Sequence, residues 1–118
     1  MPVVTIKDEF TPATYNPPEF AQEIAALFKG HFGANRVVQA PAVMGGEDFS
    51  RFYREDKTIK SFIFWVGGVP APIMAKAAKG DVSLPSLHSP FWAPEAEKVV
   101  PTAAEALTVA ALDILTKK

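Results

Sequence analysis

The sequence contains no cysteine, which excludes disulfide bonds, cysteine-ligated zinc and thiol catalysis. It also lacks a basic excess, since 12 Lys and Arg stand against 13 Asp and Glu and the net charge is -1. Binding to nucleic-acid phosphates requires clustered cations, so we expect no nucleic-acid partner. The absence of cysteine does not decide the compartment: a cytoplasmic location is slightly favoured, and an exported parent protein is the alternative.

Long apolar runs are missing too. The stretch 62–69 is strongly apolar but far shorter than the ~20 residues of a membrane-spanning helix. The N-terminus has no charged segment followed by an apolar one, so no signal peptide is indicated and we expect no membrane partner. The 118 residues, 48% of them hydrophobic, are typical of one globular domain.

Eleven prolines and seven glycines divide the chain into segments with distinct patterns. The spacing of Phe20, Ile24 and Phe28 predicts a helix over residues 18–32, with Gly33 at its C-terminal end. A short helix is predicted over residues 47–54, because acidic residues at its start suit the positive end of the helix dipole.

A longer helix is predicted over residues 102–116. Pro101 precedes it, and Thr102 with Glu105 has the spacing of a capping box. Its apolar stripe is expected to consist of Leu107, Ala110, Ala111, Ile114 and Leu115.

Three segments have the composition of β-strands, namely residues 3–6, 36–40 and 61–66. The last of these, SFIFWV, is apolar throughout and typical of a strand buried on both faces. Alternating helices and strands predict an α/β fold. So few strands cannot cover residues 61–66, so we expect either a piece of a larger domain or a chain that forms a homo-oligomer.

The first candidate site lies in the sequence MGGEDFS, residues 44–50. Gly46 would let the backbone turn sharply into a helix, and Glu47 and Asp48 would lie at the N-terminus of that helix. On the pattern alone, these residues form either a functional site or a structural turn with acids that match the helix dipole. Phosphate binding is disfavoured, because both carboxylates would repel an anion and no lysine follows.

The second candidate is His88, which lies between Pro85 and Pro90. A histidine in a loop held by prolines more often has a structural role than a ligand role. His31, at a helix end, is interpreted as a solvated or capping residue. Trp65 and Trp92 are expected in the core.

Taken together, the motifs resemble one known family. MGGEDFS is followed by FIFWVGG, then by LHSPF, then by a closing helix with the sequence AAEALTVAALDIL. This order and spacing, from residue 17 to residue 115, closely resembles the C-terminal part of metal-dependent amidohydrolases of the aminoacylase, carboxypeptidase and hippurate hydrolase family. By this resemblance His88 matches the last metal-ligand histidine of the family.

The resemblance implies a domain organisation and a chemistry. Residues 1–10 would be the last strand of a smaller lid or dimerisation domain, residues 11–18 the hinge, and residues 19–118 the C-terminal part of a catalytic domain with a mixed sheet flanked by helices. The complete enzyme would hold two divalent metal ions (zinc, manganese or cobalt) and hydrolyse N-acyl amino acids or peptide-like amides. Gly46, Glu47 and Asp48 would lie near the substrate or behind the metal ligands.

The chain departs from the family by what it lacks. The other metal ligands and the glutamate that acts as general base have no counterpart in these residues, and one histidine cannot hold a catalytic metal. The chain alone is therefore expected to bind no metal and to be inactive. Two functions remain open: a segment of an amidohydrolase, or a non-catalytic oligomerisation or interaction module.

Overall fold

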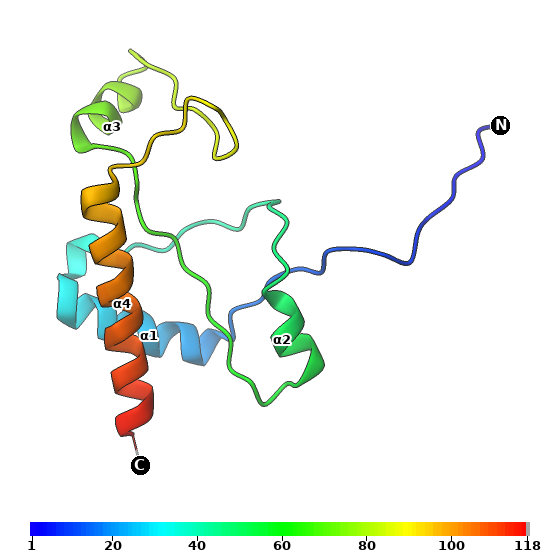
Figure 1. Ribbon diagram of the computed structural model, residues 1–118, viewed down its shortest axis with the longest axis horizontal. Helices are drawn as coiled ribbons and strands as arrows, with labels where there is room; N and C mark the ends of the chain where they lie inside the picture. The colour runs from blue at the N-terminus through cyan, green and yellow to red at the C-terminus, as the bar shows by residue number, and fades with distance from the viewer. Residues whose placement is uncertain (118) are drawn as a thin grey trace. The chain divides into compact units, whose positions relative to one another are not determined.

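The computed structural model describes residues 1–117, which form helices joined by extended segments (Figure 1). The elements are α1 (Pro18–Phe32), the short 3-10 helix η1 (Ala34–Arg36), α2 (Ser50–Glu55), α3 (Ala71–Ala78) and α4 (Ala96–Thr116). No β-strand occurs within the described residues. The predicted α/β fold with a mixed sheet flanked by helices is therefore wrong.

The chain divides into two compact units, Met1–Phe64 and Trp65–Lys118. The boundary falls inside the apolar run 61–66. The expected division, with a lid strand over residues 1–10, a hinge over residues 11–18 and a catalytic part over residues 19–118, has other boundaries and stays a prediction.

The three predicted strands are extended or irregular segments without a ladder. Residues 3–6 are exposed, and η1 ends at Arg36, where the second strand was expected to begin. In residues 61–66 the exposure alternates, with Phe62 half-buried and Ile63 exposed, so the predicted burial on both faces is wrong. Strand-like composition favours an extended backbone, but a strand also needs a neighbour that accepts and donates backbone hydrogen bonds.

In the first unit a side chain takes the place of that neighbour. The Asn16 amide donates from Nδ2 to the carbonyl oxygen of Ile63 at 2.8 Å, and its Oδ1 accepts from the Ile63 N–H at 2.9 Å. Both backbone groups of Ile63 are thereby satisfied by one residue. The side chain of Asn16 thus fixes the extended segment 61–64 to the stretch that leads into α1.

Aromatic contacts complete this attachment. Phe28 on α1 lies 5.2 Å from the ring of Phe64 and 6.5 Å from that of Phe62, measured between centroids. Phe20, at the start of α1, meets Phe62 edge to face at 6.4 Å. Such tilted and edge-to-face pairs are favourable beyond the area that they bury. The core of this unit is small, since Pro12, Ile24 and Phe28 are its only buried apolar residues.

The helix α1 confirms the prediction for residues 18–32. Gly33 has a φ of 99°, which suits glycine, and its N–H donates to the Lys29 carbonyl at 3.0 Å. The helix continues through Gly30 to its predicted end. Apolar spacing and a terminal glycine are local signals, which explains why they were sufficient here.

The helix α4 begins earlier than predicted, at Ala96. Pro101 lies inside it, so the capping box of Thr102 and Glu105 does not form. The Glu95 carbonyl accepts from Lys98 and Val99 at 2.9 Å, and this turn starts the helix one and a half turns before the proline. The missing N–H of Pro101 costs one bond near the helix start, which the longer helix outweighs.

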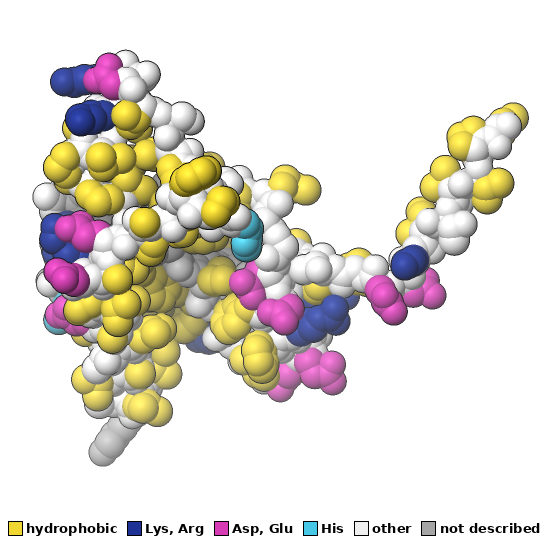
Figure 2. Space-filling view, turned by 45° about the horizontal axis from the view of Figure 1, so that its top comes forward, with side chains coloured by type: hydrophobic (Ala, Val, Ile, Leu, Met, Phe, Trp, Pro, Cys, Tyr) yellow, Lys and Arg dark blue, Asp and Glu magenta, His cyan; other side chains and the backbone are white. Residues whose placement is uncertain are grey.

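The predicted apolar stripe of α4 is also wrong. Leu107 is 60% exposed and Leu115 81% exposed, whereas Ala106, outside that stripe, is buried. Figure 2 shows hydrophobic side chains at the surface along this helix and along the N-terminal segment. At the C-terminal end of the helix, Lys117 pairs with Asp113 at 2.6 Å.

By length and composition, α4 is the one helix within residues 1–117 that could cross a membrane. Its mean hydropathy over 18 residues is 1.5. The expectation that the chain has no membrane-spanning segment was based on the short apolar stretch 62–69, which is not part of this helix. Glu105 and Asp113 lie within it, and charged residues at membrane depth are costly, so this is weak evidence for a span.

The Asn16 clamp yields a first prediction. We expect Asn16→Ala to speed amide hydrogen exchange at Ile63 by about 5- to 30-fold, because two hydrogen bonds worth roughly 0.5–1 kcal/mol each are lost. Asn35→Ala, the same substitution at an exposed position, is the matched control and should change nothing at Ile63. Equal exchange rates in the two variants would contradict the clamp.

Candidate functional site

The loop that leads into α2 contains Gly46, Glu47 and Asp48. Neither Gly45 nor Gly46 has a positive φ, and a Cβ on Gly46 would meet Thr11 at an ordinary 3.9 Å. Residues 45 and 46 form no turn, so the sharp turn expected at Gly46 is absent. Helix α2 begins at Ser50, so the two acids precede the helix and do not form its first turn.

The carboxylate of Glu47 has a local structural partner. Its Oε1 accepts from the Phe49 N–H at 3.1 Å, while the Glu47 carbonyl accepts from Ser50 Oγ at 3.4 Å. Glu47 is half-buried and Asp48 is exposed. These contacts fit the structural interpretation of the motif, in which the acid orders the chain before a helix.

The serine that ends MGGEDFS was not singled out by the sequence. Ser50 is 3% exposed, and its Oγ also lies 3.3 Å from the Pro12 carbonyl oxygen, so its single O–H is shared between this carbonyl and that of Glu47. Next to it, Arg51 donates to the Phe10 carbonyl at 3.1 Å. These hydrogen bonds join the start of α2 to residues 10–12. In the sequence, the only signal for this contact was the polar Ser50 after the two acids.

His88 lies at the tip of a loop made of successive turns. The Ser89 N–H donates to the Ser86 carbonyl, and the Trp92 N–H donates to the Ser89 carbonyl, each at 3.0 Å. Ser89 Oγ accepts from the Phe91 N–H at 3.2 Å. His88 itself is exposed, and its ring has no partner among the described residues. The loop is thus ordered by its neighbours, while the imidazole stays available.

Gly68 is a second residue whose role was not evident from the sequence. A Cβ there would lie 3.0 Å from Pro94 Cβ and 3.3 Å from the Trp92 ring, so no larger residue fits without movement. The Gly68 carbonyl also accepts from the Glu95 N–H at 2.9 Å. The glycine pair after the apolar run, Gly67 and Gly68, was the available signal.

The two tryptophans expected in the core differ. Trp92 is half-buried, but Trp65 is 64% exposed, so the expectation for Trp65 is wrong. His31 at the end of α1 is exposed, and its ring lies 4.7 Å from that of Phe32.

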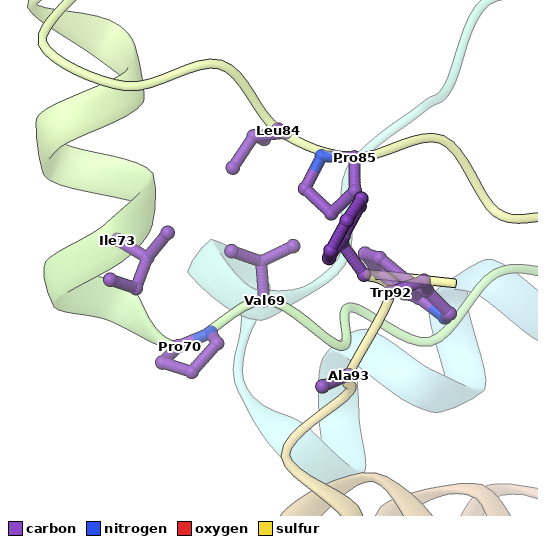
Figure 3. Close-up of a pocket in the computed structure, with 8 residues that line it drawn as sticks. Val69, Pro70, Ile73, Leu84, Pro85, Trp92 and Ala93 are labelled. Carbon is purple, nitrogen blue, oxygen red and sulfur yellow. The ribbon is translucent and has the colours of Figure 1, made fainter. Parts of the chain in front are cut away.

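An apolar cavity of about 180 Å³ lies beside the His88 loop (Figure 3). Ile73 reaches it from α3, while Leu84, Pro85 and Trp92 come from the segments that flank His88. The remaining lining residues are Val69, Pro70, Phe91 and Ala93. We call this space the Trp92 cavity.

No group of three His, Asp or Glu residues that could hold a metal ion occurs within residues 1–117. Gly46, Glu47 and Asp48 are neighbours in the first unit, and His88 belongs to the second. One imidazole supplies a single ligand, whereas catalytic zinc sites typically take three from the protein. The described residues thus provide at most part of a metal site.

No family model, curated protein or solved structure matches the chain. The resemblance to amidohydrolases therefore depends on the sequence motifs alone.

The contact of Glu47 gives a second prediction. We expect Glu47→Ala to lower the equilibrium constant for forming helix α2 by about two- to fivefold, because an acceptor worth roughly 0.5–1 kcal/mol is lost at its start. Secondary chemical shifts of residues 50–55 measure the helix population, from which this constant follows. Glu47→Gln keeps an acceptor oxygen and should retain the helix, as should Asp48→Ala. A helix lost equally with Asp48→Ala would refute the role given to Glu47.

Proposed function

We propose that the chain is the C-terminal segment of a metal-dependent amidohydrolase that cleaves N-acyl amino acids or related amides, and that His88 is one of its metal ligands. The observation that carries the proposal is the ordered set MGGEDFS, FIFWVGG and LHSPF within one chain. Each motif alone is short. Their combination in this order and spacing is much more specific.

The state of His88 supports a ligand role. A neutral imidazole coordinates a metal through a free ring nitrogen, and the ring of His88 makes no contact within residues 1–117 that would occupy it. Pro85 and Pro90 restrict the backbone on both sides, and the turns at Ser86 and Ser89 order the loop. Little conformational entropy would therefore be lost when His88 binds.

The surface of the chain supports the need for further protein around it. Its accessible surface is 9962 Å². Two separate folded domains of the sizes of the two units would together expose only about 7,600 Å² by the usual scaling with mass. Few apolar residues are buried within residues 1–117, among them Ile24, Phe28 and Ala106, whereas many large apolar side chains are exposed. Another polypeptide surface would cover them.

The chemistry divides between this chain and the rest of the enzyme. Two divalent ions would polarise the amide carbonyl and activate water, and the remaining ligands and the general base would come from outside this chain. His88 would hold one ion. Glu47, which accepts a hydrogen bond from the Phe49 N–H, would orient groups around the site without binding metal. Mutation of residues that orient metal ligands in this way typically costs about 10- to 100-fold in metal affinity or activity.

The test joins these 118 residues to the missing N-terminal portion of an amidohydrolase and compares His88→Ala with His31→Ala. We expect His88→Ala to lose hydrolysis of N-acyl amino acids and bound metal, and His31→Ala to keep both. The unmodified chain by itself should show no turnover with zinc, manganese or cobalt, because one histidine does not complete a site.

Two results would overturn the proposal. One is equal activity and equal metal content in the two variants. The other is turnover by the isolated chain that disappears in His88→Ala, since that would place a complete site within these residues.

A second function is favoured by the exposed apolar residues, namely a non-catalytic module that assembles with itself. Val3 is 93% exposed and Leu115 81% exposed, and such surface promotes association. In either role, we expect the isolated chain to form homo-oligomers at micromolar concentration in sedimentation velocity experiments. A stable, well-folded monomer would contradict this.

A further inference from the structure

We propose that the Trp92 cavity is a binding site for a single uncharged aromatic ring carried by a small molecule. The proposal rests on three features of the cavity: its volume, its lining and its accessibility. It requires neither a metal ion nor hydrolysis, so it stands or falls separately from the function proposed above.

The volume suits one ring. At about 180 Å³ the cavity has room for one ring, since an engineered apolar cavity of about 150 Å³ binds benzene, but unlike that enclosed cavity it is open to solvent on one side. It is smaller than the roughly 300–1,000 Å³ typical of sites for larger ligands. A ring with at most a small substituent therefore fits.

The lining selects against charge. All eight lining residues have apolar side chains or the amphipathic indole of Trp92, so a buried carboxylate or ammonium group would lose its hydration without compensation. Trp92 and Phe91 offer aromatic surface, which pairs favourably with another ring in tilted or offset geometry.

The cavity is also reachable and held in place. Phe91 is 83% exposed and Ile73 39% exposed, so they lie at its rim rather than in a sealed core. The Trp92 ring is in contact range of Gly68, where a Cβ would lie only 3.3 Å from it, and the Trp92 N–H donates to the Ser89 carbonyl at 3.0 Å. One wall of the cavity is therefore fixed before a ligand enters.

The test uses the full chain without metal and fluorobenzene as the probe. Binding is followed by ¹⁹F NMR of the probe and by ¹H–¹³C spectra of the methyl groups of the protein. Saturable binding is expected, with shifts of the methyl resonances of Val69, Ile73 and Leu84 and none at Ile24 in the first unit. Ile73→Trp fills the cavity and should weaken binding by about tenfold or more. Met74→Trp, the same change at the next position of α3 and outside the lining, should leave binding unchanged.

Two further measurements keep the test decisive. Circular dichroism establishes that the tryptophan variants keep their helices. If Ile73→Trp does not fold, Ile73→Ala serves as the second variant. It enlarges the cavity and should still bind the probe. No saturable binding to the unmodified chain, equal weakening by Ile73→Trp and Met74→Trp, or loss of binding in a folded Ile73→Ala would each overturn the proposal.

Discussion

The first unit depends on one interaction, the pair of hydrogen bonds between the Asn16 side chain and the backbone of Ile63. An extended apolar segment exposes N–H and C=O groups that must be satisfied, and this chain provides no neighbouring strand within residues 1–117. A side-chain amide has an NH₂ group that donates and an oxygen that accepts, and their separation allows both to bond the backbone of a single residue. With Ile63 fixed, Phe62 and Phe64 can pack on Phe28, which is how α1 acquires its small core.

The contrast between α1 and residues 61–66 shows which features a single sequence can predict. The bounds of α1 followed from apolar spacing and Gly33, which act within the helix itself. The strand at 61–66 could not follow in the same way, because pairing requires a partner whose position is not encoded locally. The start of α4 failed for a related reason: Pro101 was interpreted as a boundary, but the Glu95 carbonyl begins the helix upstream of it. Helix α3 was missed, since it follows a proline-rich stretch and spans only eight residues.

The candidate site was predictable in its residue types but not in its arrangement. MGGEDFS and LHSPF located Glu47 and His88, and the structure shows one acid engaged with the Phe49 N–H and one imidazole left available. Ser50 and Gly68 escaped notice because their importance lies in contacts with Pro12 and Trp92, which are distant in sequence. A motif indicates chemistry through residue identity, whereas burial and close approach emerge only when the chain has folded.

The charged residues after the N-terminal apolar segment have a consequence for solubility. Residues 3–6 are extended and exposed, and such segments can stack into cross-β fibrils when six or seven suitable residues are contiguous. Here Pro2 precedes the segment, and Lys7, Asp8 and Glu9 follow it, so the stretch that could stack is only four residues long. Proline and charge at the two ends act as gatekeepers. Residues 3–6 are therefore too few to stack into a cross-β fibril by themselves, while their apolar side chains can still take part in association with a folded partner.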